Sequence, residues 1–199
     1  MRYNSGMAVP SISLPLGTRA IDFLLPGTDG RNYSFDDFAA ARALVVVFSC
    51  NHCPYAKAAW PLLINLASKY RNKGVVFVAI NSNDENQYPE DSFEVMKAKV
   101  SEWGINFPYL RDQSQEIARA YQAQCTPDIY VFDYKRELYY HGRINDTWPP
   151  VEKVDGEWQT SDKKPKKEEL KEAIDALLAG KEPPKVQNPS LGCSIKWRS

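Results

Sequence analysis

Two runs of consecutive apolar residues, 44–48 and 75–80, frame a segment in which apolar residues recur at helical spacing. Unbroken runs of this length, rich in β-branched residues, are typical of strands buried on both faces of a sheet. Between the runs, Trp60, Leu63 and Ile64 lie on one side of a predicted helix that ends near residue 70. A strand, a helix and a second strand in this order predict two parallel strands joined by a right-handed crossover.

The rest of the chain carries further elements of both kinds. Residues 21–25 and 32–33 flank a turn with Gly27 and Gly30, which can adopt positive φ, and they predict an N-terminal hairpin. Further helices are expected at 89–103, 115–123 and 168–179, and further strands at 108–111, 128–133 and, returning antiparallel, 138–144. The pattern predicts an α/β fold, a central mixed β-sheet flanked by helices, with the hairpin as an N-terminal extension.

The charges of the chain balance, with 25 Lys and Arg against 25 Asp and Glu, so nothing favours binding to nucleic acid or to an anionic membrane. The apolar runs are far shorter than the roughly 18 residues that a membrane span needs. Residues 1–10 lack the apolar core of a signal peptide, which predicts a cytoplasmic protein. In a chain of 199 residues we expect an arm over 1–15, one domain over 16–180, and a tail over 181–199 that packs on the domain.

The first apolar run leads directly into Cys50, Asn51, His52 and Cys53, followed by Pro54 and the predicted helix. Because proline is tolerated in the first helical turn, Cys50 is expected near the helix cap and Cys53 within the first turn. A helix N-terminus offers free N–H groups and the positive end of a dipole, and both stabilise a thiolate. We therefore expect Cys50 to attack disulfides and Cys53 to resolve the mixed disulfide, while His52 favours the thiolate and the reduced form.

A strand, a CxxC motif and a helix in succession resemble the thioredoxin superfamily. The segment Phe48-Ser-Cys-Asn-His-Cys-Pro-Tyr55 is most similar to peroxiredoxin-like redoxins that carry a CxxC, within the broad alkyl hydroperoxide reductase/thiol-specific antioxidant group. The resemblance runs from about Leu16 to the C-terminus and implies a thioredoxin-like fold whose cysteine pair needs no cofactor. It also implies that Thr126 and Pro127, which precede a predicted strand, hold a cis proline beside the CxxC and bind substrate together with Asn51.

The chain departs from both family patterns. Thioredoxins place a tryptophan immediately before the first cysteine and a buried acid six positions before it, where this chain has Ser49 and Leu44. Peroxiredoxins carry Pro-x-x-x-Thr-x-x-Cys, and aligning their peroxidatic cysteine with Cys53 puts Cys50 at the threonine. Their peroxide-polarising arginine falls at Pro127 in this chain. These departures favour disulfide exchange over fast peroxide reduction.

Two further cysteines leave alternatives open. Cys125 is either a small buried hydrophobic residue or a third thiol beside the CxxC, since the proline loop would pack there. Cys193 either lies in an exposed tail or docks, with Ile195 and Trp197, against Cys125 or the CxxC. A zinc site needs four ligands, usually in two closely spaced pairs, and the sequence holds no second CxxC, so we expect no metal.

Three other features have competing interpretations. Asn81 and Asn83 follow a buried strand, where they either shape the redox face or form turns. His141 is expected on a strand face rather than as a ligand. The long segment 145–167, which contains Trp148, forms either a flap near the redox site or a solvated excursion.

The sequence thus predicts a thiol–disulfide oxidoreductase that cycles Cys50 and Cys53 between dithiol and disulfide. Its expected partners are protein or small-molecule disulfides and thiols, and because of His52 its potential is expected above the thioredoxin end, about −270 mV. One alternative is a thiol-dependent peroxidase that reduces hydroperoxides with Cys53 or Cys50. A second alternative is a non-enzymatic binding module that retains the fold.

Overall fold

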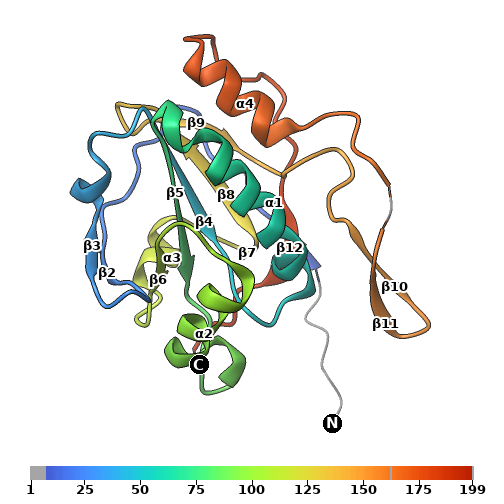
Figure 1. Ribbon diagram of the computed structural model, residues 1–199. Helices are drawn as coiled ribbons and strands as arrows, with labels where there is room; N and C mark the ends of the chain where they lie inside the picture. The colour runs from blue at the N-terminus through green and yellow to red at the C-terminus, as the bar shows by residue number, and fades with distance from the viewer. Residues whose placement is uncertain (1–7, 162, 199) are drawn as a thin grey trace.

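The computed structural model describes residues 8–161 and 163–198, and five strands form its central sheet in the order β6-β5-β4-β8-β9 (Figure 1). These strands are β4 Ala43–Phe48, β5 Val75–Asn81, β6 Tyr109–Arg111, β8 Asp128–Phe132 and β9 Leu138–His141. β4 pairs parallel with β5, and β5 with β6, whereas β8 pairs antiparallel with β4 and with β9. The predicted mixed sheet is therefore confirmed.

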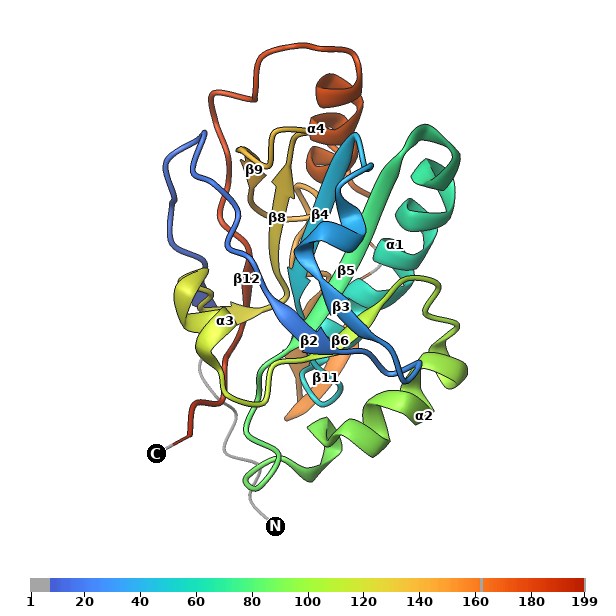
Figure 2. The same cartoon turned by 90° about the vertical axis from the view of Figure 1, so that its left-hand side faces the viewer.

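Helices and a hairpin divide between the two faces of this sheet (Figure 2). α1 (Pro54–Tyr70) and α4 (Glu169–Leu178) cover one face. α3 (Glu116–Ala120) and the predicted N-terminal hairpin, made of β2 (Leu24–Pro26) and β3 (Asn32–Ser34), cover the other face. The described residues also form α2, Phe93–Trp103, at the β6 edge, and three 3₁₀ helices, η1 Phe35–Phe38, η2 Arg71–Lys73 and η3 Pro89–Asp91.

β4 supplies both hydrophobic cores, because successive side chains of a strand point to opposite faces. Val45 and Val47 join the core beneath α1 and α4, whereas Leu44, Val46 and Phe48 join the core beneath the hairpin and α3. No residue of β4 exposes more than 1% of its surface. Burying each of the larger side chains contributes about 1.5–3 kcal/mol, which fixes the strand that carries the CxxC at its carboxyl end.

The segment 145–167 forms secondary structure that the sequence analysis did not predict. It contains a second hairpin, β10 (Val151–Val154) and β11 (Glu157–Thr160), which projects from the rest of the fold (Figure 1). Asp155 and Gly156 form its turn, and both have positive φ. An Asp-Gly pair between two strands is a strong hairpin signal, because the turn it favours matches the twist of the strands.

The two ends of the described chain meet at a small separate sheet. β12 (Leu191–Ser194) lies between β1 (Ala8–Pro10) and β7 (Cys125–Thr126), antiparallel to both. The predicted tail thus runs beside the proline loop, whereas residues 1–7 of the predicted arm lie outside the described residues. Among the described helices, none combines the length and the apolar composition required to span a membrane.

Candidate active site

The CxxC loop joins the carboxyl end of β4 to the N-terminus of α1. Cys53 is the N-cap residue, with extended backbone, and Pro54 is the first helical residue. Proline favours this position because its fixed φ suits the helix and its missing N–H would have no partner there. The structure therefore corrects the predicted register by one step, since Cys53 is the cap and Cys50 lies three residues before it.

Both sulfurs of the motif are buried next to the proline loop. Cys50 Sγ lies 3.3 Å from Thr126 Oγ1, and Cys53 Sγ lies 3.3 Å from the carbonyl oxygen of Thr126. The two thiols are also hydrogen-bonded to each other, and the Thr126–Pro127 peptide bond is cis. Neither cysteine exposes any surface, and all four cysteines of the chain are free thiols. The structure thus brings these four predicted residues together.

The acidic thiol is Cys53 rather than Cys50. Burial alone would raise the pKa of Cys53, but hydrogen bonds from the Cys193 and Cys50 thiols and from the backbone N–H of Ala56 hold it well below its usual value of 9.0. Burial raises the pKa of Cys50, and the hydrogen bond to Cys53 and the charge of Asp91 raise it further. The helix cap and its N–H groups belong to Cys53, which favours Cys53 rather than Cys50 as the thiolate, the opposite of the predicted assignment.

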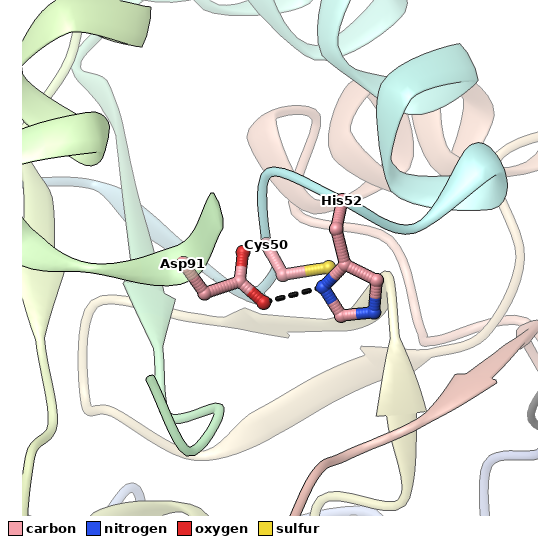
Figure 3. Close-up of side chains that lie close together, drawn as sticks. All are labelled: Cys50, His52 and Asp91. Atoms are coloured by element: carbon pink, nitrogen blue, oxygen red, sulfur yellow. Dashed lines mark hydrogen bonds and ion pairs between the residues drawn. The ribbon is translucent and has the colours of Figure 1, made fainter. Parts of the chain in front are cut away.

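A buried carboxylate that sequence analysis missed lies beside Cys50 (Figure 3). Asp91 ends η3, and its Oδ2 accepts hydrogen bonds from His52 Nδ1 at 2.5 Å and Asn83 Nδ2 at 2.8 Å. Its Oδ1 accepts from the backbone N–H of Asn51 at 2.6 Å and from Asn81 Nδ2 at 3.4 Å. Burial would raise the pKa of Asp91, but these donors, His52 foremost, hold it below 3.8. Asn81 and Asn83 thus shape the redox face through Asp91.

His52 and Asn51 have different roles from those predicted. The His52 ring pairs with Asp91 and stacks on Tyr88 with 4.5 Å between ring centroids, so its Nδ1 faces a carboxylate rather than a cysteine sulfur. Asn51 is buried, its Nδ2 donates to the carbonyl oxygen of Glu90, and its Oδ1 accepts from Tyr109. Because these bonds leave no side-chain polar group of Asn51 facing outward, its predicted role in substrate binding is replaced by a role in holding the loop.

Cys50, His52 and Asp91 also have the composition of a metal-ligand set. One ligand atom from each residue lies within 4.8 Å of the other two. Each oxygen of Asp91 already accepts two hydrogen bonds, however, so a metal ion bound there would have to displace at least the bond from His52. The donor set present fits an ion pair beside a thiol better than it fits a metal centre.

The surroundings of Cys193 and Cys125 distinguish between the alternatives that the sequence left open for each. Cys193, on β12, exposes 7% of its surface, and its thiol is hydrogen-bonded to Cys53, so it docks against the CxxC rather than lying in an exposed tail. Cys125 points away, with its sulfur 3.4 Å from the carbonyl oxygen of Pro127. Burial and the charge of Asp128 raise the pKa of Cys125, which fits a small buried hydrophobic residue.

Comparison with known proteins identifies the family of the chain. Residues 16–141 match the AhpC/TSA family. The chain belongs to this family. The matched residues include Cys50, Cys53 and Cys125 but end before Cys193, although the resemblance was expected to reach the C-terminus.

Individual relatives place the chain among thioredoxin-like redoxins. The chain is 23% identical over 121 residues to thiol-disulfide oxidoreductase ResA of Bacillus subtilis (strain 168), covering 61% of this chain and 63% of that protein. A hypothetical protein from Sinorhizobium meliloti 1021 is 40% identical, with a TM-score of 0.87 over 96% of this chain and 98% of the other. The thioredoxin domain of a thiol-disulfide oxidoreductase from Bacteroides vulgatus, 17% identical, has a TM-score of 0.56 over 65% of this chain and 89% of its own. The predicted thioredoxin-like fold is confirmed.

Proposed function

We propose that this AhpC/TSA family protein is a thiol–disulfide oxidoreductase that cycles Cys50 and Cys53 between dithiol and disulfide. One observation carries the proposal: both sulfurs of the CxxC lie 3.3 Å from Thr126, at a helix N-terminus and directly beside the cis proline Pro127. Names of relatives that share the fold, such as thiol-disulfide oxidoreductase ResA, support the same activity. The substrates would be disulfides and thiols of proteins or small molecules.

The low pKa of Cys53 makes it the attacking group, because the thiolate is the nucleophile in disulfide exchange. Its sulfur attacks one sulfur of the target disulfide, forms a mixed disulfide and releases the first target thiolate. Cys50 then attacks Cys53, closes the Cys50–Cys53 disulfide and releases the second target thiolate. Cys50 must lose a proton in this second step, and the paired His52 and Asp91 lie beside it.

The buried sulfurs set a condition on this cycle. Because neither Cys50 nor Cys53 exposes any surface, a target disulfide can reach Cys53 only when part of the cover moves. β12 is part of that cover, since it pairs with β7 and places Cys193 against Cys53. Small disulfides are therefore expected to react faster than disulfides held within a folded protein.

Single-cysteine variants test the assignment with an aromatic disulfide such as 5,5′-dithiobis(2-nitrobenzoate) and with insulin. Cys53→Ser should abolish disulfide reduction, and Cys50→Ser should lower multiple turnover, because the Cys50–Cys53 disulfide that releases the second target thiolate can no longer form. Cys125→Ser is the matched control and should retain turnover. If Cys53→Ser turned over normally, the assignment of the attacking group would be wrong, and if all three variants kept the biological activity, the chain would be a binding module.

A second candidate, reduction of hydroperoxides, is favoured by the position of the acidic thiol. Cys53 occupies the place of the peroxidatic cysteine in the family pattern, at the N-cap of α1, with the low pKa that attack on peroxide needs. The same variants discriminate the two functions in a stopped-flow measurement of hydrogen peroxide consumption, with sulfenate trapping on Cys53. We expect slow peroxide consumption, because Pro127 occupies the position of the arginine that polarises peroxide in peroxiredoxins. A cytoplasmic location, where thiols are kept reduced, fits either activity.

A further inference from the structure

β12 brings a third sulfur to the redox pair from the far end of the chain. Cys193 is opposite Thr126 in the antiparallel pairing of β12 with β7, and residues opposite each other in such a pair place their side chains on the same face. Thr126 turns its Oγ1 to Cys50 on that face. Cys193 therefore faces the redox pair, and it packs in the same buried cluster as Cys50 and Cys53.

Contacts at both ends of β12 fix the position of Cys193. On one side, a Cβ added to Gly192 would lie 2.1 Å from the carbonyl oxygen of Thr126, so only glycine permits this close approach. Trp148 Nε1 donates to the carbonyl oxygen of Leu191 at 2.9 Å. On the other side, the backbone N–H of Ile195 donates to the carbonyl oxygen of Gln124 at 3.0 Å. Such a set of contacts holds the Cys193 thiol in place rather than leaving it on a loose tail.

We propose that Cys193 is a third redox thiol, which exchanges with Cys53 so that the oxidised protein holds either a Cys50–Cys53 or a Cys53–Cys193 disulfide. This inference rests on the proposed function, which supplies the Cys50–Cys53 disulfide. In the exchange, the thiolate of Cys193 attacks Cys53 Sγ, the Cys53–Cys193 bond forms and the Cys50–Cys53 bond breaks. Cys50 leaves and takes up the proton that Cys193 gave up, so no electrons enter or leave the protein.

The exchange would make the disulfide of the oxidised protein accessible from solvent. Cys50 and Cys53 expose no surface, whereas Cys193 exposes 7% of its surface. A thiol reductant, either two small molecules or a dithiol protein, would attack Cys193 Sγ, form a mixed disulfide with Cys193 and release Cys53 as a thiol. Its second thiol would then attack the reductant sulfur of this mixed disulfide, which releases Cys193 as a thiol and leaves the reductant as a disulfide. Cys53 is the shared sulfur in both disulfides because it caps α1, the helix that contacts β12.

A disulfide map of the wild-type protein tests the proposal directly. The reduced protein is oxidised with one equivalent of diamide, quenched in acid, alkylated and digested with trypsin. Cys50 and Cys53 remain together in peptide 43–57, whereas Cys193 is in peptide 186–196 and Cys125 is in peptide 120–135. A Cys53–Cys193 disulfide therefore appears as a cross-link of 43–57 to 186–196, which a Cys50–Cys53 disulfide cannot produce.

Variants sharpen the result. We expect the cross-link in the wild type, and in Cys50→Ser we expect it to be the main oxidised form. Cys125→Ser is the matched control and should not change the map. Gly192→Ala should lower the cross-link relative to the Cys50–Cys53 disulfide, because the added Cβ pushes β12 off Thr126.

Two results would overturn the proposal, and they differ in what else they overturn. A wild-type protein that forms the Cys50–Cys53 disulfide and reduces substrates, without the cross-link in the wild type or in Cys50→Ser, would refute the role of Cys193 alone. A wild-type protein that forms neither disulfide would refute the proposed function as well.

Discussion

Both histidines of the chain are hydrogen-bonded to buried aspartates, yet the two pairs have different surroundings. His52 Nδ1 lies 2.5 Å from Asp91 Oδ2, and the two residues come from a loop and a short 3₁₀ helix. His141 Nε2 lies 2.7 Å from Asp128 Oδ1, and these residues belong to the adjacent strands β9 and β8. The side chain of His52 is 15% exposed and that of His141 only 2%. One pair therefore borders the surface, whereas the other is part of the sheet.

Each aspartate also raises the pKa of a nearby thiol, Asp91 that of Cys50 and Asp128 that of Cys125, in both cases after burial as the larger cause. The electrostatic setting of the two thiols is thus similar. What differs is the second sulfur: Cys50 is hydrogen-bonded to Cys53, whereas Cys125 contacts a backbone carbonyl. The comparison shows that a buried carboxylate beside a thiol does not by itself define the redox site. The redox site also needs a second thiol, Cys53, at the N-cap of a helix next to the first.

The largest expected effect comes from Asp91→Asn. This change removes the charge that accepts four hydrogen bonds and turns an amide N–H₂ toward donors such as the backbone N–H of Asn51. Breaking a buried ion pair by neutralising one partner costs about 3–5 kcal/mol, and we expect a loss of that size in urea unfolding. Asp128→Asn is the matched control, and it should also destabilise the fold but leave the pKa of Cys50 unchanged.

The pH dependence of Asp91→Asn supplies the second arm of this test. Because the folded pKa of Asp91 lies below its ordinary 3.8, the carboxylate contributes stability that is fully present above 3.8 and is lost as the pH falls through the folded value. The difference in free energy of unfolding between wild type and Asp91→Asn should therefore shrink below pH 3.8. A difference that stays constant down to the folded pKa would contradict the ion-pair account.

The next largest effect should come from His52→Gln. This change leaves Asp91 without its ring partner, so the carboxylate opposes negative charge on the Cys50–Cys53 pair more strongly and the reduced form is disfavoured. We expect the potential of the Cys50–Cys53 couple to fall by about 30 mV, which corresponds to ~1.4 kcal/mol. Equilibration with a dithiothreitol redox buffer measures it. His141→Gln is the matched control and should leave the potential unchanged. Equal shifts in the two variants would show that the effect of His52 on the potential does not depend on its place beside Cys50.

The part of the site that could be predicted from sequence is the part that is local along the chain. A continuous apolar run placed β4, Pro54 placed the start of α1, and the CxxC between them had to lie at a strand-to-helix junction. Thr126 and Pro127 were placed beside the thiols by resemblance, and the structure puts Thr126 within 3.3 Å of Cys50. These features depend on spacing and on residue type alone.

The rest of the site depends on contacts between distant segments. Asp91 is 40 residues from Asn51, and the only signal for it was the polar run that follows β5 at the carboxyl end of the sheet. The reversal of the thiol roles arose because the pKa of a buried thiol is set by its neighbours in space, and one of those neighbours is Cys193. No periodicity in the sequence indicates that β12 pairs with β7.

The smallest expected effect comes from Cys125→Ser. This variant tests whether a buried carboxylate beside a thiol is enough to make that thiol redox-active. The serine hydroxyl can keep the hydrogen bond to the carbonyl oxygen of Pro127, so we expect a change in the free energy of unfolding of about 1 kcal/mol or less. The potential of the Cys50–Cys53 couple and the rate of disulfide reduction should remain those of the wild type, although Cys125 has a buried carboxylate beside it as Cys50 does. Parallel redox titration and iodoacetamide labelling check this outcome. A shifted potential would mean that Cys125 exchanges with Cys50 and Cys53. A carboxylate beside a thiol would then be enough for that thiol to take part in the redox reaction.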